Sequence, residues 1–147
     1  MTSPVATKLT YRSVEVGDEA PVLTHVLTRA DLVQYAGASG DFNPMHTDEV
    51  AAKEAGLESV FGHGMLSAGL LATAITNWAG VGNLARFSVR FVKQAWPGDE
   101  FTTRVVVKAK RVHGDTHLVD LDCTLAGRNG EVKVAGEATV IVGDDEA

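Results

Sequence analysis

Residues 64–80, GMLSAGLLATAITNWAG, are the stretch that decides the fold of this chain. The stretch carries no charged side chain, and a helix that is apolar on nearly every face must be buried. We therefore expect a buried helix over residues 65–78. A membrane-spanning helix needs about 20 strongly apolar residues, whereas this stretch is shorter and includes Ser67, Thr73 and Asn77. Membrane insertion is therefore not expected.

The sequence after this helix alternates apolar and polar residues with a period of two, which is typical of strands with one buried face. Turn-forming residues separate the alternating runs. Such short turns predict antiparallel neighbours, because a parallel pair needs a crossover of about a dozen residues or more. Four strands are expected in this half of the chain, over residues 86–91, 101–110, 119–125 and 132–142.

Two apolar segments near the N-terminus, residues 11–16 and 22–26, add one or two strands, so that about five or six are expected in all. One face of that sheet needs a cover, and only the helix over residues 65–78 is apolar enough to supply it. The sequence therefore predicts an α+β fold in which an antiparallel sheet curls around one long buried helix. Residues 1–147 are expected to form a single domain, since one core commonly serves about 100–200 residues.

Two shorter helices are expected before the buried one. Thr28 and Asp31 have the spacing of a capping box, which predicts a helix over residues 28–39 that two glycines end. A second, short helix is expected to stop at Gly56. Residues 40–46, which lie between them, are rich in Gly, Asp, Asn and Pro and are predicted to form a loop.

The composition argues against several classes of function. Lys and Arg number 13 and Asp and Glu 19, and the resulting net charge of −6 does not suit a protein that binds a nucleic-acid backbone through clustered positive charge. Residues 1–8 lack the basic start and apolar run of a secretory signal, so a cytoplasmic location is expected. The lone Cys123 is expected to act as an apolar filler. No glycine-rich phosphate-binding motif is present, and no nucleotide cofactor is expected.

Residues able to carry chemistry gather at two places. Asp41, Asn43 and His46 lie in the predicted loop, and His63 and Gly64 lie at the start of the buried helix. By spacing alone, the loop residues are ordinary turn formers beside an exposed histidine. Alternatively, Asp41 and the two histidines supply the donor types of a non-haem iron site, although no pair has the four-residue spacing of helical zinc motifs. No serine or cysteine stands in a nucleophile motif.

Two motifs in this region resemble a known family. The run YAGASGDFNPMH at residues 35–46 is followed by FGHGMLS at residues 61–67. Together they resemble the MaoC-like family of (R)-specific enoyl-CoA hydratases and (3R)-hydroxyacyl-ACP dehydratases. The resemblance extends from the segment before Thr28 through the closing strands. Within the family, the chain is most similar to the catalytic B subunit of actinobacterial heterodimeric (3R)-hydroxyacyl-ACP dehydratases.

The resemblance implies a hot-dog fold, which is the curled sheet and buried helix already predicted from periodicity. It also implies that Asp41 and His46 are the catalytic pair and that Ser67 supports the loop by hydrogen bonding. Asn43 is expected to shape the loop and to belong, with Gly64 and His63, to the residues that bind the substrate. The reaction would be the reversible hydration of trans-2-enoyl thioesters, carried by CoA or ACP, to (3R)-3-hydroxyacyl thioesters. This chemistry requires no metal or organic cofactor.

The chemistry of the reaction assigns roles to these residues. Dehydration removes a C2 proton and expels the C3 hydroxyl as water, so that one acid and one base are needed. His46 is expected to take the C2 proton, because histidine ordinarily titrates near neutral pH. Asp41 is expected to hold the water and protonate the leaving oxygen. The backbone N–H of Gly64 is expected to stabilise charge on the thioester oxygen, with His63 beside it as a binding or supporting residue.

Other functions stay open at this point. Hot-dog folds also include thioesterases, which would hydrolyse the thioester with a carboxylate-activated water. The chain would otherwise be a non-catalytic acyl-binding subunit of a heterodimeric dehydratase. Because a single sheet leaves unpaired strand edges, we expect a dimer with a second hot-dog chain, either identical or different.

Overall fold

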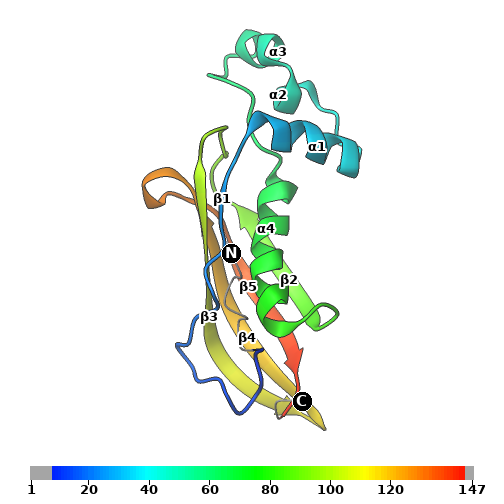
Figure 1. Cartoon of the computed structure of the whole chain (residues 1–147), viewed down its shortest axis with the longest axis vertical. Coiled ribbons are helices and arrows are strands. Elements are labelled where there is room, and N and C mark those ends of the chain that lie inside the picture. The colour runs from blue at the N-terminus through cyan, green and yellow to red at the C-terminus, as the bar shows by residue number, and fades with distance from the viewer. Residues whose placement is uncertain (1–7, 145–147) are drawn as a thin grey trace, which may run out of the picture.

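The computed structural model describes residues 8–144, which build a five-stranded antiparallel sheet that curls around one helix (Figure 1). The order of the strands in the sheet is β1-β3-β4-β5-β2, and every pairing is antiparallel, as predicted. The strands are β1 (Thr24–Val26), β2 (Leu84–Phe91), β3 (Glu100–His113), β4 (Thr116–Ala126) and β5 (Val132–Val142), and a single 3-10 turn, η1 (Arg128–Gly130), precedes β5.

Four helices complete the described part of the chain. The long helix α4 (Gly64–Ala79) lies across one face of the sheet and confirms the helix predicted over residues 65–78. Three shorter helices lie together beyond the N-terminal end of α4 (Figure 1). They are α1 (Arg29–Ser39), α2 (Pro44–Thr47) and α3 (Glu49–Glu54).

The core lies between α4 and the sheet, where the period-two pattern of the strands meets the apolar face of the helix. Leu71 and Ile75 of α4 are fully buried, as are Leu121 and Leu125 of β4. Burial of each such side chain stabilises the fold by about 1.5–3 kcal/mol. The Cys123 side chain lies in the same layer, as expected for an apolar filler, and burial raises the pKa of its thiol to about 11.

One face of α4 departs from the expectation of burial on nearly every side. Met65 is 60% exposed, and Gly69 and Thr73, one and two turns further on, are also exposed. These residues lie four positions apart and therefore share a face. In the described part of the chain no element covers this face, because the sheet ends beside it at the edge strand β2.

The segment before the buried helix was predicted correctly at its caps and wrongly in its loop. Thr28 and Asp31 form the capping box at the start of α1. Gly40 closes that helix in the left-handed conformation, with φ of 76°, whereas Gly37 lies inside the helix and does not end it. Residues 44–46, predicted as part of a loop, belong to the helical turn α2, because Asn43 caps it and proline is well suited to the first helical position.

Residues 11–16 form no strand, so the sheet has five strands rather than six. The Thr10 hydroxyl donates to the Ser13 hydroxyl over 2.7 Å, and the Ser13 N–H donates to the Thr10 hydroxyl over 3.2 Å. These local hydrogen bonds fold the segment into a turn and compete with strand pairing. The expectation about a signal at residues 1–8 falls mostly on residues 1–7, which lie outside the described residues.

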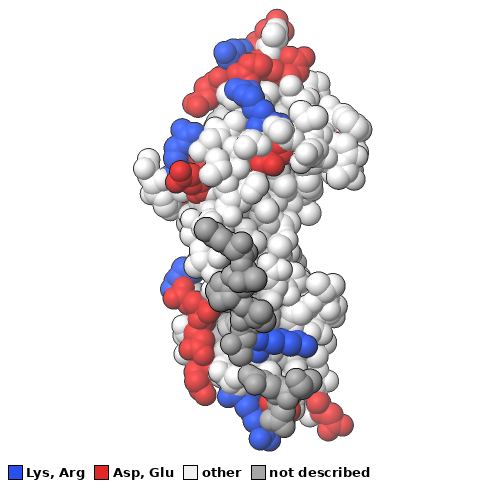
Figure 2. Space-filling model, viewed as in Figure 1, with Lys and Arg blue, Asp and Glu red and all other residues white. Residues whose placement is uncertain are grey.

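Charged side chains are unevenly spread over the face shown in Figure 2. They gather over α3 at one end and again at the opposite end of the molecule, whereas much of the surface over α4, between α1 and β2, is uncharged (Figure 2). Across residues 8–144, the helices are all too short or too polar to span a lipid bilayer.

Candidate active site

Asp41 and His46 are positioned by a chain of local caps that begins where α1 ends. The Asp41 carboxylate accepts the N–H of Asn43 over 3.2 Å, and the Asn43 side chain accepts the N–H of Met45 over 3.1 Å. These bonds satisfy donors at the start of α2 that have no partner inside the helix. The short helix then presents the His46 ring toward Asp41. Asn43 therefore caps α2, but its exposed side chain does not line the pocket described below, and its expected part in substrate binding stays a prediction.

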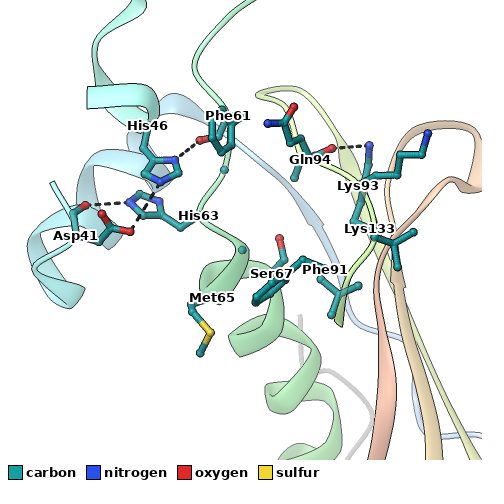
Figure 3. A pocket seen from close by; sticks show the side chains of 15 residues that line it. Asp41, His46, Phe61, His63, Met65, Ser67, Phe91, Lys93, Gln94 and Lys133 are labelled. Atoms are coloured by element: carbon teal, nitrogen blue, oxygen red, sulfur yellow. Dashed lines mark hydrogen bonds and ion pairs between the residues drawn. The ribbon is translucent and has the colours of Figure 1, made fainter. Parts of the chain in front are cut away.

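The His46 ring is 7% exposed, which rules out the exposed loop histidine that spacing alone allowed. Its Nδ1 lies 2.7 Å from the carbonyl oxygen of Phe61 (Figure 3). Because a carbonyl only accepts, Nδ1 must carry the proton, and in the neutral ring Nε2 is left with its lone pair. Nε2 lies 3.8 Å from a carboxylate oxygen of Asp41, whose side chain is half exposed.

His63 joins the pair from the other side. Its ring stacks on that of His46, with 3.8 Å between ring centroids and 27° between ring planes. Its Nε2 donates to the backbone carbonyl of Asp41 over 3.1 Å, and its buried Nδ1 has no hydrogen-bond partner among residues 8–144. Burial is the largest influence and lowers the pKa of His63, so the ring is held neutral. His63 thereby anchors the backbone that carries Asp41.

The N-terminus of α4 opens beside the two histidines. His63 occupies the N-cap position without a capping side-chain bond, and within residues 8–144 the N–H groups of Gly64 and Met65 have no acceptor. Unpaired N–H groups at a helix N-terminus favour negative charge. A Cβ at Gly64 would lie 3.0 Å from the Phe91 ring, so any larger residue at this position would crowd that ring.

These groups border a pocket of about 460 Å³, which is large enough for a small organic ligand. Asp41, His46, His63, Gly64 and Ser67 all line it. Ser67 is 3% exposed, and its hydroxyl has no hydrogen-bond partner among residues 8–144, so the expected support of the loop by a Ser67 hydrogen bond is not seen. The structure thus brings together every predicted site residue except Asn43.

The opposite wall of the pocket was not foreseen. It consists of Phe91, the last residue of β2, and of residues 92–95, which follow that strand, together with Lys133 and Val134 of β5 (Figure 3). The alternation in β5 placed Val134 inward and its polar neighbours outward, yet Lys133 is only 3% exposed. The sole signal in the sequence was a lysine inside an otherwise apolar run, which is too common on a solvated strand face to indicate a site.

The site also contains the donor types of a metal centre. Asp41, His46 and His63 offer ligand atoms that lie within 4.8 Å of one another. Two imidazoles that bind one ion must direct their in-plane lone pairs to one point. Here the rings stack face to face, so those lone pairs lie in nearly parallel planes. The arrangement suits proton exchange better than coordination of a metal ion.

A curled antiparallel sheet around one long helix, with a histidine and an aspartate at the edge of a pocket, is the arrangement of hot-dog proteins. Comparison with known proteins identifies the family. The model of the MaoC like domain matches residues 12–127. The (R)-specific enoyl-CoA hydratase of Rhodospirillum rubrum is 31% identical over 134 residues, which cover 90% of each protein. The mitochondrial 3-hydroxyacyl-[acyl-carrier-protein] dehydratase of Arabidopsis thaliana is 31% identical over 121 residues, which cover 81% of this chain and 72% of the relative.

A solved structure agrees with this placement. The unliganded R-hydratase PhaJ1 of Pseudomonas aeruginosa superposes with a TM-score of 0.85 at 27% identity, covering 94% of this chain and 88% of that one. The chain therefore belongs to the MaoC-like domain family, and the predicted hot-dog fold is confirmed. The narrower resemblance to the B subunit of actinobacterial dehydratases stays a prediction.

Proposed function

We propose that this chain catalyses the reversible hydration of trans-2-enoyl thioesters to (3R)-3-hydroxyacyl thioesters. The observation that carries the proposal is the 3.8 Å gap between Nε2 of His46 and the Asp41 carboxylate at the edge of the pocket. The gap exceeds a direct hydrogen bond, but one oxygen atom fits within hydrogen-bond distance of both groups. The pair can therefore hold either a water molecule or the C3 hydroxyl of a substrate.

The protons balance if the two groups exchange roles with the direction of the reaction. In dehydration, neutral His46 takes the C2 proton at Nε2, while a protonated Asp41 gives its proton to the leaving C3 oxygen, which departs as water. In hydration, the resulting carboxylate takes a proton from the attacking water and the imidazolium returns one to C2. The bond from Nδ1 to the Phe61 carbonyl keeps Nε2 aimed at the reacting atoms throughout.

The N-terminus of α4 supplies the remaining requirement. Removal of the C2 proton places negative charge on the thioester oxygen, and preorganised N–H donors are the usual means of stabilising such charge. Gly64 offers a free N–H on the wall of the pocket that also holds His46. The same N–H group would bind the thioester oxygen in either direction of the reaction.

Crotonyl-CoA tests the proposal directly. Loss of the enone absorbance without release of thiol means hydration, whereas release of free thiol would indicate a thioesterase. Asp41→Asn and His46→Ala should each lower kcat by about 10²-fold or more, the scale of lost general acid–base help. Asp115→Asn and His113→Ala, at exposed positions around the β3–β4 turn, are matched controls that should leave kcat unchanged. Native turnover in both site variants, or none in the native chain under any pairing, would contradict the proposal.

We also infer that the working unit is a dimer with a second hot-dog chain. The sheet ends at the eight-residue strand β2, which pairs only with β5. Phe91, at the end of that strand, is 54% exposed, and beside it lies the exposed face of α4 that contains Met65. Unpaired edges and exposed apolar side chains are normally covered in proteins.

Light scattering distinguishes the possible partners. A homodimer of the chain alone that hydrates crotonyl-CoA supports an identical partner, and activity that arises only on mixing with another hot-dog chain supports a different one. A fully active monomer would refute the dimer. Parallel assays with crotonyl-CoA and crotonyl-ACP identify the carrier. A cytoplasmic location stays part of the proposal, and fractionation of the source cells tests it.

A further inference from the structure

A buried ion cluster lies behind the unforeseen wall of the pocket. Lys133 is 3% exposed, and its ammonium group donates to the Glu131 carboxylate over 2.7 Å and to the backbone carbonyl of Gln94 over 2.9 Å. A third oxygen, from the Asp99 carboxylate, lies 3.7 Å away. A buried lysine is rare unless its charge is compensated, and here three oxygens surround a group that has three donors. The site is therefore built around this ammonium group.

Asp99 completes the cluster and is equally buried, at 1% exposure. Its carboxylate accepts the N–H of Trp96 over 2.7 Å and that of Arg128 over 3.3 Å. Packing around the lysine stem is tight, since a Cβ at Gly127 would lie 2.7 Å from Cε of Lys133. The cluster thus fixes the turn that follows the pocket wall.

Lys133 holds the pocket wall through both its side chain and its backbone. Its side chain holds Gln94, and its backbone carbonyl accepts the N–H groups of Val92 and Lys93 over 2.8 and 3.3 Å. Residues 92–95 lie outside the regular strands and would otherwise be attached only at a few points. Lys133 therefore makes three of the hydrogen bonds that hold this segment.

The wall is connected in turn to the catalytic histidine. The carbonyl of Ala95 accepts the N–H of Gly62 over 2.7 Å. Gly62 lies directly between Phe61, whose carbonyl orients His46, and His63, which stacks on it. A Cβ at Gly62 would lie 3.1 Å from Leu27, so the residue has little freedom to shift.

We propose that Lys133 is a positioning residue of the active site, which fixes residues 92–95 and, through Gly62, the groups that orient His46. The inference rests on the proposed function, because it assigns His46 a role in proton exchange. Partners outside the reacting atoms that orient a catalytic group typically change activity by about 10–100-fold when removed. Lys133 acts through three contacts in series, which are its bond to Gln94, the bond between Ala95 and Gly62, and the bond between Phe61 and His46. It takes no part in the proton exchange itself.

The test uses the double variant Lys133→Met with Asp99→Asn. Lys133→Met alone removes the buried ammonium group beside Asp99, leaves the exposed Arg128 guanidinium 3.5 Å from the buried carboxylate, and risks unfolding. The asparagine removes the second buried charge and keeps an acceptor for the Trp96 N–H. Lys108→Met is the matched control, since Lys108 pairs with Glu137 on the exposed face of the sheet, away from the pocket.

Two readouts are needed. The first is kcat and KM with crotonyl-CoA. The second is the NMR signal of the His46 Nδ1 proton in protein with isotope-labelled histidine, which reports the bond to Phe61 whether or not the enzyme turns over. The double variant should unfold within about 4 °C of the native Tm. We expect its kcat to fall by about 10–100-fold with a smaller change in KM, and its His46 signal to shift or broaden, while Lys108→Met changes neither.

Each outcome decides the question. An unchanged His46 signal in the folded double variant overturns the inference, whatever the activity. Unfolding of the double variant also overturns it, because the cluster would then hold the whole fold rather than the pocket wall. If the native chain fails to hydrate crotonyl-CoA, the proposed function fails, and the NMR comparison still shows whether Lys133 positions His46.

Discussion

Replacement of Gly64 by alanine separates the stability of the fold from its chemistry. The new Cβ would lie 3.0 Å from two atoms of the Phe91 ring, whereas carbon atoms in comfortable contact lie about 3.5–4.0 Å apart. The ring must therefore move by about 0.5–1 Å. Phe91 is 54% exposed and ends the edge strand, so it can yield without disturbing the core. Alanine also favours a helix over glycine by up to about 1 kcal/mol.

We therefore expect Gly64→Ala to keep or slightly raise the Tm while activity falls. Gly64 and Phe91 both line the pocket, and a displacement of about 1 Å at a reacting centre can cost about 10²-fold in rate. The assays are thermal unfolding and kcat/KM with crotonyl-CoA. Gly37→Ala is the control, because Gly37 lies inside α1 with open space around it, and it should stabilise the fold by about 1 kcal/mol without changing kcat/KM. Native kcat/KM in folded Gly64→Ala would refute the assignment of Gly64 to the thioester.

Three further predictions follow from the geometry. The lowered pKa of His63 means that its contribution to stability is complete above the ordinary histidine pKa of about 6.5 and is lost as the pH falls; Tm against pH should therefore be flatter in His63→Phe than in the native chain, and equal slopes would contradict this. A Cβ at Gly136 would lie 2.0 Å from the backbone oxygen of Ser88, so Gly136→Ala should lower the free energy of unfolding by about 3 kcal/mol or more, and an unchanged urea midpoint would disprove it. Exhaustive chelation should leave kcat unchanged, and loss of activity restored by iron or zinc would show that the stacked histidines bind a metal.

The parts of the fold that depend on local pattern could be predicted from the sequence. Thr28 and Asp31 form their capping box from neighbours three residues apart, and the alternation in β4 places Leu121 and Leu125 in the core. A local hydrogen bond decided between the five and six strands that the sequence allowed, because Thr10 and Ser13 bond to each other and the segment that follows joins no strand. Composition and periodicity do not register such side-chain competition.

In the candidate site, too, local sequence predicted one part and missed the part that depends on distant contacts. Asp41, His46 and His63 were found because two short motifs bring them together, and their local caps explain the geometry. The wall that contains Lys133 comes from segments far apart in the sequence, and Gln94 lies 39 residues from the lysine that holds it. No spacing rule links such positions, so only the folded chain places them together.

The single thiol offers a way to measure how often the sheet opens. Cys123 lies on β4, the central strand, is 2% exposed and has a pKa raised by burial to about 11. A thiol reagent reacts with the thiolate, which is scarce at neutral pH and out of reach in the folded chain. The rate at which the native protein is labelled therefore measures how often the middle of the sheet separates from α4. Substitutions at the pocket should leave that rate unchanged, and those that loosen the core should raise it.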